Sequence, residues 1–141
     1  MRVSLVPSTN PGDYAFAHQL RVRFAETDAM GVVHHGAYLP YLEEARVAYL
    51  RAIGHPYDTV RSAGVDFAVI ELAISYLAPL RFDDVADVYL MMGAASRATF
   101  QIAYLVMSDS PRATAVTVHG CVDAAGRPVR MPGWLRTSLA R

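Results

Sequence analysis

The stretch "ETDAMGVVHHGAYLPYLEEARVAYL", residues 26–50, decides the fold, because it contains the one long segment with a helical period. One face carries apolar side chains at the i, i+4, i+7 and i+11 spacing of a helix, namely Tyr38, Leu42, Ala45 and Tyr49. Pro40 is compatible with a helix only in its first turn, so the helix should begin near Gly36–Tyr38. Gly54 and Pro56 are expected to end it.

The rest of the chain has the period of β-strands. Residues 18–24 alternate, with Leu20, Val22 and Phe24 on one face. Four longer strands are expected after the helix, at residues 67–77, 85–94, 98–107 and 113–123. Their short links favour antiparallel neighbours. Residues 1–16 are expected to form a loose leader. We therefore predict one α+β domain over 1–141, in which one long helix packs on a five- or six-stranded antiparallel sheet.

Composition excludes several classes of function. The 141 residues carry a formal net charge of zero, which gives no electrostatic footprint for nucleic acid or an acidic membrane. All thirteen basic residues are arginine, so no lysine Schiff base or P-loop chemistry is available. The single cysteine, Cys121, allows no internal disulfide, and no segment is apolar for long enough to be a signal peptide or to span a bilayer. We expect a cytoplasmic protein without membrane insertion.

One helix can cover only one face of a sheet of this size. The other face would expose apolar residues, among them Phe100, Val116 and Val118. Monomers rarely leave such large apolar patches in water, so a homodimer or homotetramer is expected.

An acid, a glycine-rich loop and a histidine come directly before the helix. The first turn of a helix has unpaired N–H groups that can stabilise an oxyanion at an acyl carbonyl. Asp28 lies a short loop away and is placed to act as a nucleophile or as a base for water. Gly31 and Gly36 let this loop turn tightly, and His35 falls at the helix start. These parts fit an acyl-transfer site, although a "TD" pair before a glycine is, on the residues alone, more often a simple turn cap.

The segment "TDAMGVVHHGAYLPYLEEAR", residues 27–46, resembles the "D-x-x-G-V-V-(Y/H)-H-x-x-Y-L-x-x-(F/L)-E" motif of hotdog-fold acyl-CoA thioesterases. The resemblance is to the 4-hydroxybenzoyl-CoA thioesterase type, including the related Tol–Pal-associated enzymes. The positions that match are Asp28, Gly31, Val32, Val33, His35, Tyr38, Leu39 and Glu43. The resemblance extends weakly into "ISYLAPLRFDD" and "GRPVRMP". It implies a hotdog fold, a helix wrapped by the sheet, and no cofactor.

The resemblance also implies residue roles. Asp28 corresponds to the catalytic carboxylate, which either attacks the thioester or activates water, and the His35 N–H polarises the carbonyl. The His35 ring is implied as an assisting group. Gly31, Val33, Tyr38 and Phe67 are expected around the oxyanion and acyl group, and the acyl pocket, lined by Val33, Tyr38 and residues near Phe67, is expected to form between subunits. Phe24 departs from the pattern, because a tyrosine usually stands there in the branch that carries the histidine.

The coenzyme A arm needs cationic and polar groups at a surface groove. By the same resemblance, Ser96, Arg97 and Thr99 are the candidates for binding its phosphates. Arg127 and Arg130 are further candidates. Glu43 is a minor candidate for a helix carboxylate in catalysis. We expect Glu71, which interrupts an apolar strand, to pair with an arginine.

The sequence predicts hydrolysis of an acyl-CoA or acyl-carrier-protein thioester to free acid and thiol. A hotdog enoyl-CoA hydratase or dehydratase and a non-catalytic acyl-CoA-binding module are the alternatives. A zinc site from His34, His35 and His119 is disfavoured, because adjacent histidines rarely share a metal and the usual ligand spacings are missing.

Overall fold

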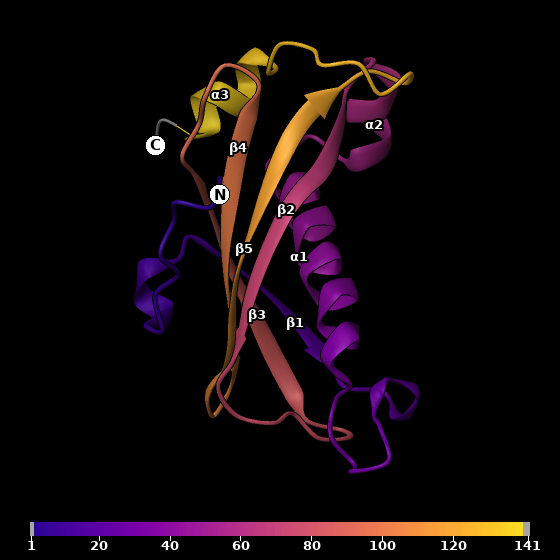
Figure 1. Cartoon of the computed structure of the whole chain (residues 1–141), viewed down its shortest axis with the longest axis vertical. Helices are drawn as coiled ribbons and strands as arrows, with labels where there is room; N and C mark the ends of the chain where they lie inside the picture. The colour runs from indigo at the N-terminus through magenta and orange to yellow at the C-terminus, as the bar shows by residue number, and fades with distance from the viewer. Residues whose placement is uncertain (1, 140–141) are drawn as a thin grey trace.

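A five-stranded antiparallel sheet forms the body of the computed structural model, which describes residues 2–139 (Figure 1). The strands follow the order β1-β3-β4-β5-β2, so that β1 and β2 form the two edges. Their bounds are β1 Phe16–Arg21, β2 Asp66–Tyr76, β3 Val85–Gly93, β4 Thr99–Ser108 and β5 Ser110–Val122. The predicted strand count and antiparallel pairing are confirmed, and the predicted ends lie within three residues of those observed.

Residues 2–139 form three α-helices beside the sheet, of which the sequence predicted only the long one. The long helix is α1 (Tyr38–Ala52), and the short ones are α2 (Tyr57–Ser62) and α3 (Gly133–Leu139). Helices of six or seven residues are too short to show a helical period in the sequence. The start of α1 agrees with the expected position, because a 3-10 turn at His35–Ala37 leads directly into it.

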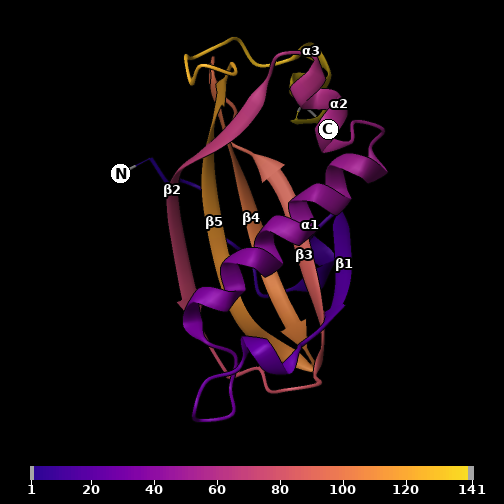
Figure 2. The ribbon, with the colours of Figure 1, turned by 90° about the vertical axis from the view of Figure 1, so that its right-hand side faces the viewer.

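Helix α1 crosses one face of the sheet diagonally (Figure 2). It buries a stripe of side chains made of Tyr38, Tyr41, Leu42, Ala45 and Leu50. The small side chain of Ala45 is fully buried, which lets the helix lie close to the sheet. The sheet supplies the other half of this core, chiefly Leu90, Phe100, Ile102 and Tyr104. This packing fixes the N-terminal end of α1 beside the loop that carries Asp28 (Figure 2).

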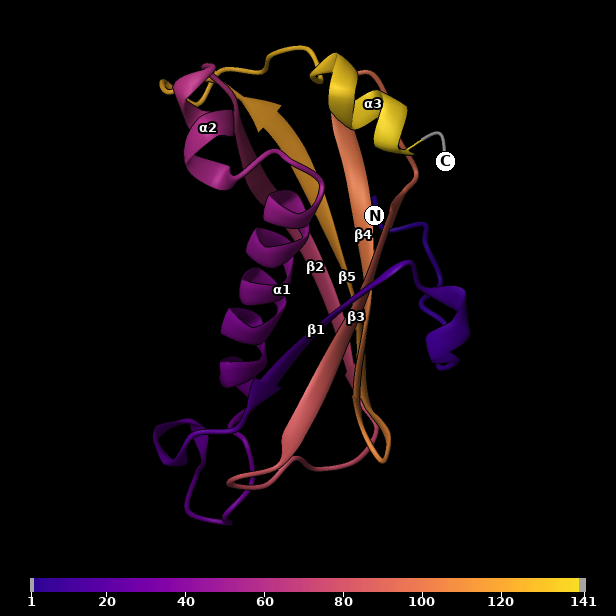
Figure 3. The ribbon, with the colours of Figure 1, turned by 180° about the vertical axis from the view of Figure 1, so that it is seen from behind.

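The predicted leader is not loose. It lies on the side of the sheet opposite α1 (Figure 3). The Gln101 side chain accepts hydrogen bonds from Ser4 N (2.9 Å) and Leu5 N (3.2 Å), and donates one to Arg2 O at 2.7 Å. Glu71 accepts from Arg2 N at 3.0 Å and from Val3 N at 3.3 Å. The predicted arginine side-chain partner of Glu71 is therefore wrong, because backbone amides of the leader satisfy this carboxylate.

The apolar face expected to need a second subunit is closed within the chain. Val116 and Val118 are only 2% and 1% exposed. Phe100 belongs to the core under α1, where its ring stacks on that of His119. Four large apolar side chains are exposed along the edge strand β2, namely Val69, Ile70, Leu72 and Tyr76, and others are exposed in loops, such as Phe24, Met30 and Phe82. Among the strands, this edge is the apolar surface that a second copy could cover.

The prediction that the first strand extends to Phe24, on one face with Leu20 and Val22, is wrong. Strand β1 ends at Arg21, and a 3-10 turn follows at Phe24–Glu26. The Phe24 ring is 76% exposed and meets the Phe82 ring edge-on at 5.7 Å. Among residues 2–139, no helix is both long and apolar enough to cross a membrane.

Candidate active site

The loop between β1 and α1 closes on itself at Asp28. Asp28 N donates to Val32 O at 2.8 Å, and Gly31 N donates to Asp28 O at 2.9 Å. Gly31 has φ of 78°, a left-handed conformation that favours glycine. Residues Thr27 and Val33 then form a backbone bridge that completes the turn. The sequence "DAMG" thus forms a compact turn directly before the helix.

The Asp28 carboxylate has one oxygen engaged and one free. Its Oδ1 accepts from Met30 N at 2.9 Å and, at a long 3.4 Å, from Val32 N. Within the described residues, Oδ2 has no hydrogen-bond partner. The side chain is partly exposed. Asp28 therefore caps its own turn and still presents an oxygen to a ligand.

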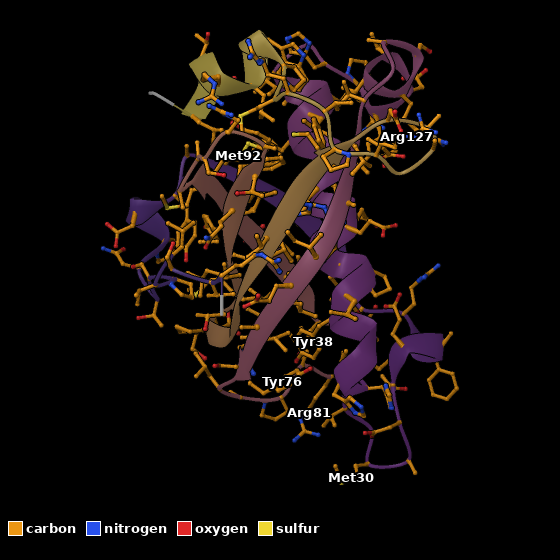
Figure 4. The ribbon with its side chains drawn as sticks, turned by 45° about the horizontal axis from the view of Figure 1, so that its top comes forward. Met30, Tyr38, Tyr76, Arg81, Met92 and Arg127 are labelled. Atoms are coloured by element: carbon orange, nitrogen blue, oxygen red, sulfur yellow. The ribbon has the colours of Figure 1, made fainter. Side chains whose placement is uncertain are left out.

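The same turn recurs at residues 123–127, which allows the two to be compared. Asp123 Oδ1 accepts from Ala125 N and Arg127 N, both at 2.9 Å, and Gly126 has φ of 80°. Asp123 N donates to Arg127 O, as Asp28 N does to Val32 O. The turns differ in their surroundings, because only the one at Asp28 adjoins the start of α1. The second turn lies at the other end of the molecule, where Figure 4 labels Arg127.

The start of α1 presents a free amide. His34 N donates to Glu26 O at 2.8 Å, and Gly36 N donates to His34 Nδ1 at 3.0 Å. The N–H of His35 has no acceptor among residues 2–139. The rings of His34 and His35 lie 4.0 Å apart and are exposed. His34 thus holds the turn, and His35 supplies the unpaired donor that is expected at a helix start.

Asp28 and His35 line one open depression of about 410 Å³, together with Val33, Tyr38 and Tyr76. Tyr76 Oη donates to His35 O at 2.9 Å, and its ring meets that of Tyr38 at 5.2 Å. Figure 4 shows Met30, Tyr38, Tyr76 and Arg81 gathered at this end of the molecule. Burial raises the pKa of the Tyr38 hydroxyl, so it stays neutral. A carboxylate oxygen and an amide donor therefore border the same partly apolar space, as polarisation of an acyl carbonyl requires.

Tyr76 lines this depression, although the sequence pointed to it only as a strand residue and as part of the weak resemblance in "ISYLAPLRFDD". It ends β2 and reaches across to the backbone of His35. The signal was present in "ISYLAP", where an aromatic residue with a hydroxyl precedes the proline that closes the strand.

Phe67 lies apart from Asp28 within the chain. It lines a different cavity, beneath the middle of α1, and its ring meets that of Phe100 edge-on at 5.3 Å. Glu43 borders the same cavity, where its carboxylate lies 3.9 Å from Arg46. Neither residue lines the depression at Asp28. The expected grouping of Phe67 with Val33 and Tyr38 is therefore absent from a single chain.

The three candidates for binding coenzyme A lie in and after the β3–β4 connection, at the end of the sheet opposite Asp28 (Figure 1). The hydroxyls of Ser96 and Thr99 contact one another. Arg136 Nη2 donates to Ser96 O at 3.0 Å, which ties this connection to α3. Arg97 is exposed. None of the three lines the depression at Asp28.

Two other side chains are placed away from the depression. His119 is buried on β5, while His34 and His35 lie in the exposed loop. Cys121 is a buried free thiol, and burial raises its pKa to about 11. A thiol with so high a pKa is a poor nucleophile at neutral pH.

The family model named Thioesterase-like superfamily matches residues 22–139. The chain belongs to this superfamily. Within the Thioesterase-like superfamily, the acyl-CoA thioesterase YbgC of Haemophilus influenzae is 32% identical over 123 residues, which are 85% of this chain and 90% of that protein. The 1,4-dihydroxy-2-naphthoyl-CoA hydrolase of Synechococcus elongatus is 32% identical over 132 residues, 88% and 96% of the two chains.

A crystal structure of a protein from Aquifex aeolicus aligns with a TM-score of 0.84 at 38% identity, and covers 89% of this chain and 99% of that one. The superfamily and these similarities confirm the predicted class of enzyme, a thioester hydrolase, and the hotdog type of fold.

Proposed function

We propose that the protein hydrolyses an acyl-CoA or an acyl-carrier-protein thioester to free acid and thiol in the depression at Asp28. The observation that carries the proposal is that Asp28 and His35 border one space, each with an unpaired group, carboxylate Oδ2 and backbone N–H. The two relatives described above are named for hydrolysis of coenzyme A thioesters, which supports the same class of substrate here.

The chemistry needs two contributions from the chain. The His35 N–H donates to the thioester oxygen and stabilises the negative charge that develops there. Asp28 either attacks the carbonyl carbon, giving a mixed anhydride that water then cleaves, or takes a proton from an attacking water. In both routes the carbon–sulfur bond breaks, the thiolate leaves and is protonated, and the acid is released. The His35 ring is available to carry that proton.

Pairing of two copies along β2 would complete the site. Strand β2 is an edge strand with exposed apolar side chains, and within residues 2–139 no other strand pairs with its outer hydrogen-bonding edge. Antiparallel pairing about its centre would set Phe67 of one copy opposite Ser75 of the other, next to Tyr76. The acyl pocket would then include Phe67 from the second copy, and Ser96, Arg97 and Thr99 of that copy would lie at the same end as Asp28. This supports a homodimer, or a tetramer of two such dimers.

The test is a pair of matched variants, Asp28→Asn and Asp123→Asn. Both remove a charge from the same kind of turn, so both should change the free energy of unfolding by a similar, small amount. Only Asp28→Asn should lower kcat, by at least ~100-fold, in a thiol-release assay with a panel of aromatic, short-chain and long-chain acyl-CoAs and acyl carrier proteins. Near-full activity of a folded Asp28→Asn protein would refute the assignment.

The competing functions give other outcomes in the same assay. A hydratase would add water to an enoyl-CoA without releasing thiol, and a binding module would retain acyl-CoA with no thiol release. A single turnover in ¹⁸O-labelled water that places the label on Asp28 would identify the anhydride route, because general-base hydrolysis labels only the released acid.

A further inference from the structure

The chain that leaves strand β2, residues 76–81, is joined to the loop that carries Asp28. Leu80 O accepts a hydrogen bond from Val33 N at 2.8 Å. The residues that come next to these two in each segment form a backbone bridge. Leu80 is fully buried, so this junction lies against the core. The end of β2 therefore holds the Asp28 loop from one side.

Residues 76–81 are themselves fixed by Arg112 on β5. Arg112 O accepts hydrogen bonds from Leu77 N at 2.8 Å and from Ala78 N at 3.2 Å. The guanidinium of the same residue donates to Pro79 O at 2.6 Å. Because three consecutive residues bind Arg112, the backbone of this segment is a firm base from which a side chain can position its neighbours.

Tyr76, the last residue of β2, joins this base to the first turn of helix α1. Its hydroxyl donates to His35 O at 2.9 Å. Its ring meets the ring of Tyr38 edge-on at 5.2 Å, and both side chains lie at the same end of the molecule (Figure 4). Tyr38 is only 3% exposed, so the Tyr76 ring rests on a buried side chain. This packing supports the hydroxyl in the position from which it reaches His35.

The direction of the His35 N–H depends on the two peptide groups that flank His35. The carbonyl of the preceding group, His34 O, accepts from Ala37 N at 2.9 Å. The carbonyl of the following group, His35 O, accepts from the Tyr76 hydroxyl. The residue after His35 is Gly36, and glycine gives a helix start little stiffness of its own because its backbone is the least restricted. The bond from Tyr76 therefore supplies a restraint that this turn lacks.

We propose that Tyr76 is a positioning residue for the oxyanion donor, whose hydrogen bond to His35 O keeps the His35 N–H in its direction relative to Asp28. The inference rests on the proposed function and adds a residue of β2 to the site. Tyr76 borders the same depression, but its hydroxyl has a single hydrogen. While that hydrogen is bonded to His35 O, the hydroxyl cannot donate to a substrate, so the role is one of positioning.

The test compares Tyr76→Phe with Tyr14→Phe in the thiol-release assay. Tyr76→Phe keeps the ring against Tyr38 and removes only the hydroxyl. We expect kcat to fall by roughly three- to tenfold, the value of one hydrogen bond, with KM within about twofold, because the donor acts on the transition state. Tyr14→Phe is the matched control, since its hydroxyl also donates to a backbone carbonyl, Ser8 O at 2.7 Å. This control should change neither kcat nor KM.

Amide hydrogen exchange in the ligand-free protein provides a second measurement that needs no substrate. In Tyr76→Phe, the amides of Gly36 and Ala37 should exchange roughly three- to tenfold faster, because the turn opens more often. The ¹³C shift of the His35 carbonyl should change as well, since its hydrogen bond is lost. The amide of Gly31, in the Asp28 turn, should exchange as in the natural sequence.

The two measurements together decide the role of Tyr76. Faster exchange with an unchanged kcat would show a merely structural bond, and a lower kcat with unchanged exchange would show that the hydroxyl acts on the substrate directly. Either result overturns the proposal. A natural sequence that releases no thiol contradicts the proposed function itself, whereas an active protein whose Tyr76→Phe variant keeps its kcat contradicts only the role of Tyr76.

Discussion

Tyr41 Oη donates a hydrogen bond to Glu26 Oε1 at 2.6 Å, which joins helix α1 to the loop that carries Asp28. Glu26 holds this loop at both ends. Its carboxylate also accepts from Arg23 N and Arg23 Nε, each at 2.8 Å, and its carbonyl accepts from His34 N. Asp28 lies between these anchors, so the position of its carboxylate relative to the His35 amide depends on Glu26.

Tyr41→Phe should lower both the free energy of unfolding and kcat. The variant removes a buried hydrogen bond to a charged group, and should lower the free energy of unfolding by roughly 1.5–3 kcal/mol. We expect kcat to fall by about tenfold or more, because the loop is no longer fixed to α1. Urea unfolding and thiol release measure the two effects. Tyr14→Phe, which removes a hydroxyl bonded to Ser8 O in the leader, should affect stability alone. Unchanged kcat in Tyr41→Phe would contradict the positioning role.

Glu26 should make stability depend on pH in the acidic range. Desolvation raises the pKa of Glu26, but the hydrogen bonds from Tyr41 and Arg23 and the charge of Arg23 outweigh it, so the pKa lies below 4.5, the ordinary value. The unfolded chain therefore binds a proton first as the pH falls. The stabilisation is present above about pH 4.5 and is lost as the pH drops through the folded pKa.

The variant Glu26→Gln isolates this contribution. It should be less stable than the natural sequence at pH 7, and the difference in urea midpoint between the two proteins should narrow from pH 5 to pH 3. Other carboxylates titrate in both proteins, so the difference reports on Glu26. A difference that stays constant over this range would contradict the lowered pKa.

Gly31→Ala should impair catalysis, whereas Gly126→Ala should not. Both glycines have positive φ, 78° and 80°, and neither has an atom within 4 Å of an added Cβ. Each substitution should therefore lower the free energy of unfolding by about 1–2 kcal/mol, through backbone strain alone. Relief of that strain at Gly31 would shift Asp28, so kcat should fall only there. An equal loss of kcat in the two variants, or no loss in either, would contradict the prediction that Gly31 positions Asp28.

Sequence reasoning succeeded where the relationship between residues is local. The spacing of Tyr38, Leu42 and Ala45 predicted α1, and Asp28 and His35 line one depression because seven positions separate them around a tight turn. Phe67 and Arg97 could not be placed relative to Asp28 in this way. Their distance from it depends on how the sheet is assembled and on whether copies pair.

The prediction of a loose leader is wrong, because the side chains that bind the leader are distant from it in the sequence. Its prolines and asparagine indicate a loop, and nothing local shows where its amides bind. The signal lay in the strands, where Gln101 and Glu71 interrupt apolar runs and need partners when they are covered. Both side chains bind backbone groups of the leader, including Arg2 and Ser4.

Gln101→Ala should release the leader from the sheet. The variant removes the acceptor of Ser4 N and Leu5 N and the donor to Arg2 O. We expect faster amide hydrogen exchange at residues 3–6 and a free energy of unfolding lower by roughly 1–3 kcal/mol. Gln19→Ala, which removes an exposed side chain bonded to Asp87, is the control and should change little. Unaltered exchange at residues 3–6 would show that other contacts hold the leader.

Leu72→Glu tests whether copies pair along β2. Leu72 is 39% exposed in the middle of this edge strand, and a charge there would be buried without a partner if two copies met. We expect the natural sequence to sediment as a dimer or tetramer and Leu72→Glu to sediment as a monomer with its circular dichroism unchanged. Thiol release should fall with it, because Phe67 and Asp28 of different copies would no longer share a ligand. Val6→Glu, at a side chain 91% exposed on the leader, should leave the assembly intact. If Leu72→Glu sediments like the natural sequence, the interface lies elsewhere. The proposed acyl pocket, made of Asp28 from one copy and Phe67 from the other, would then be contradicted as well.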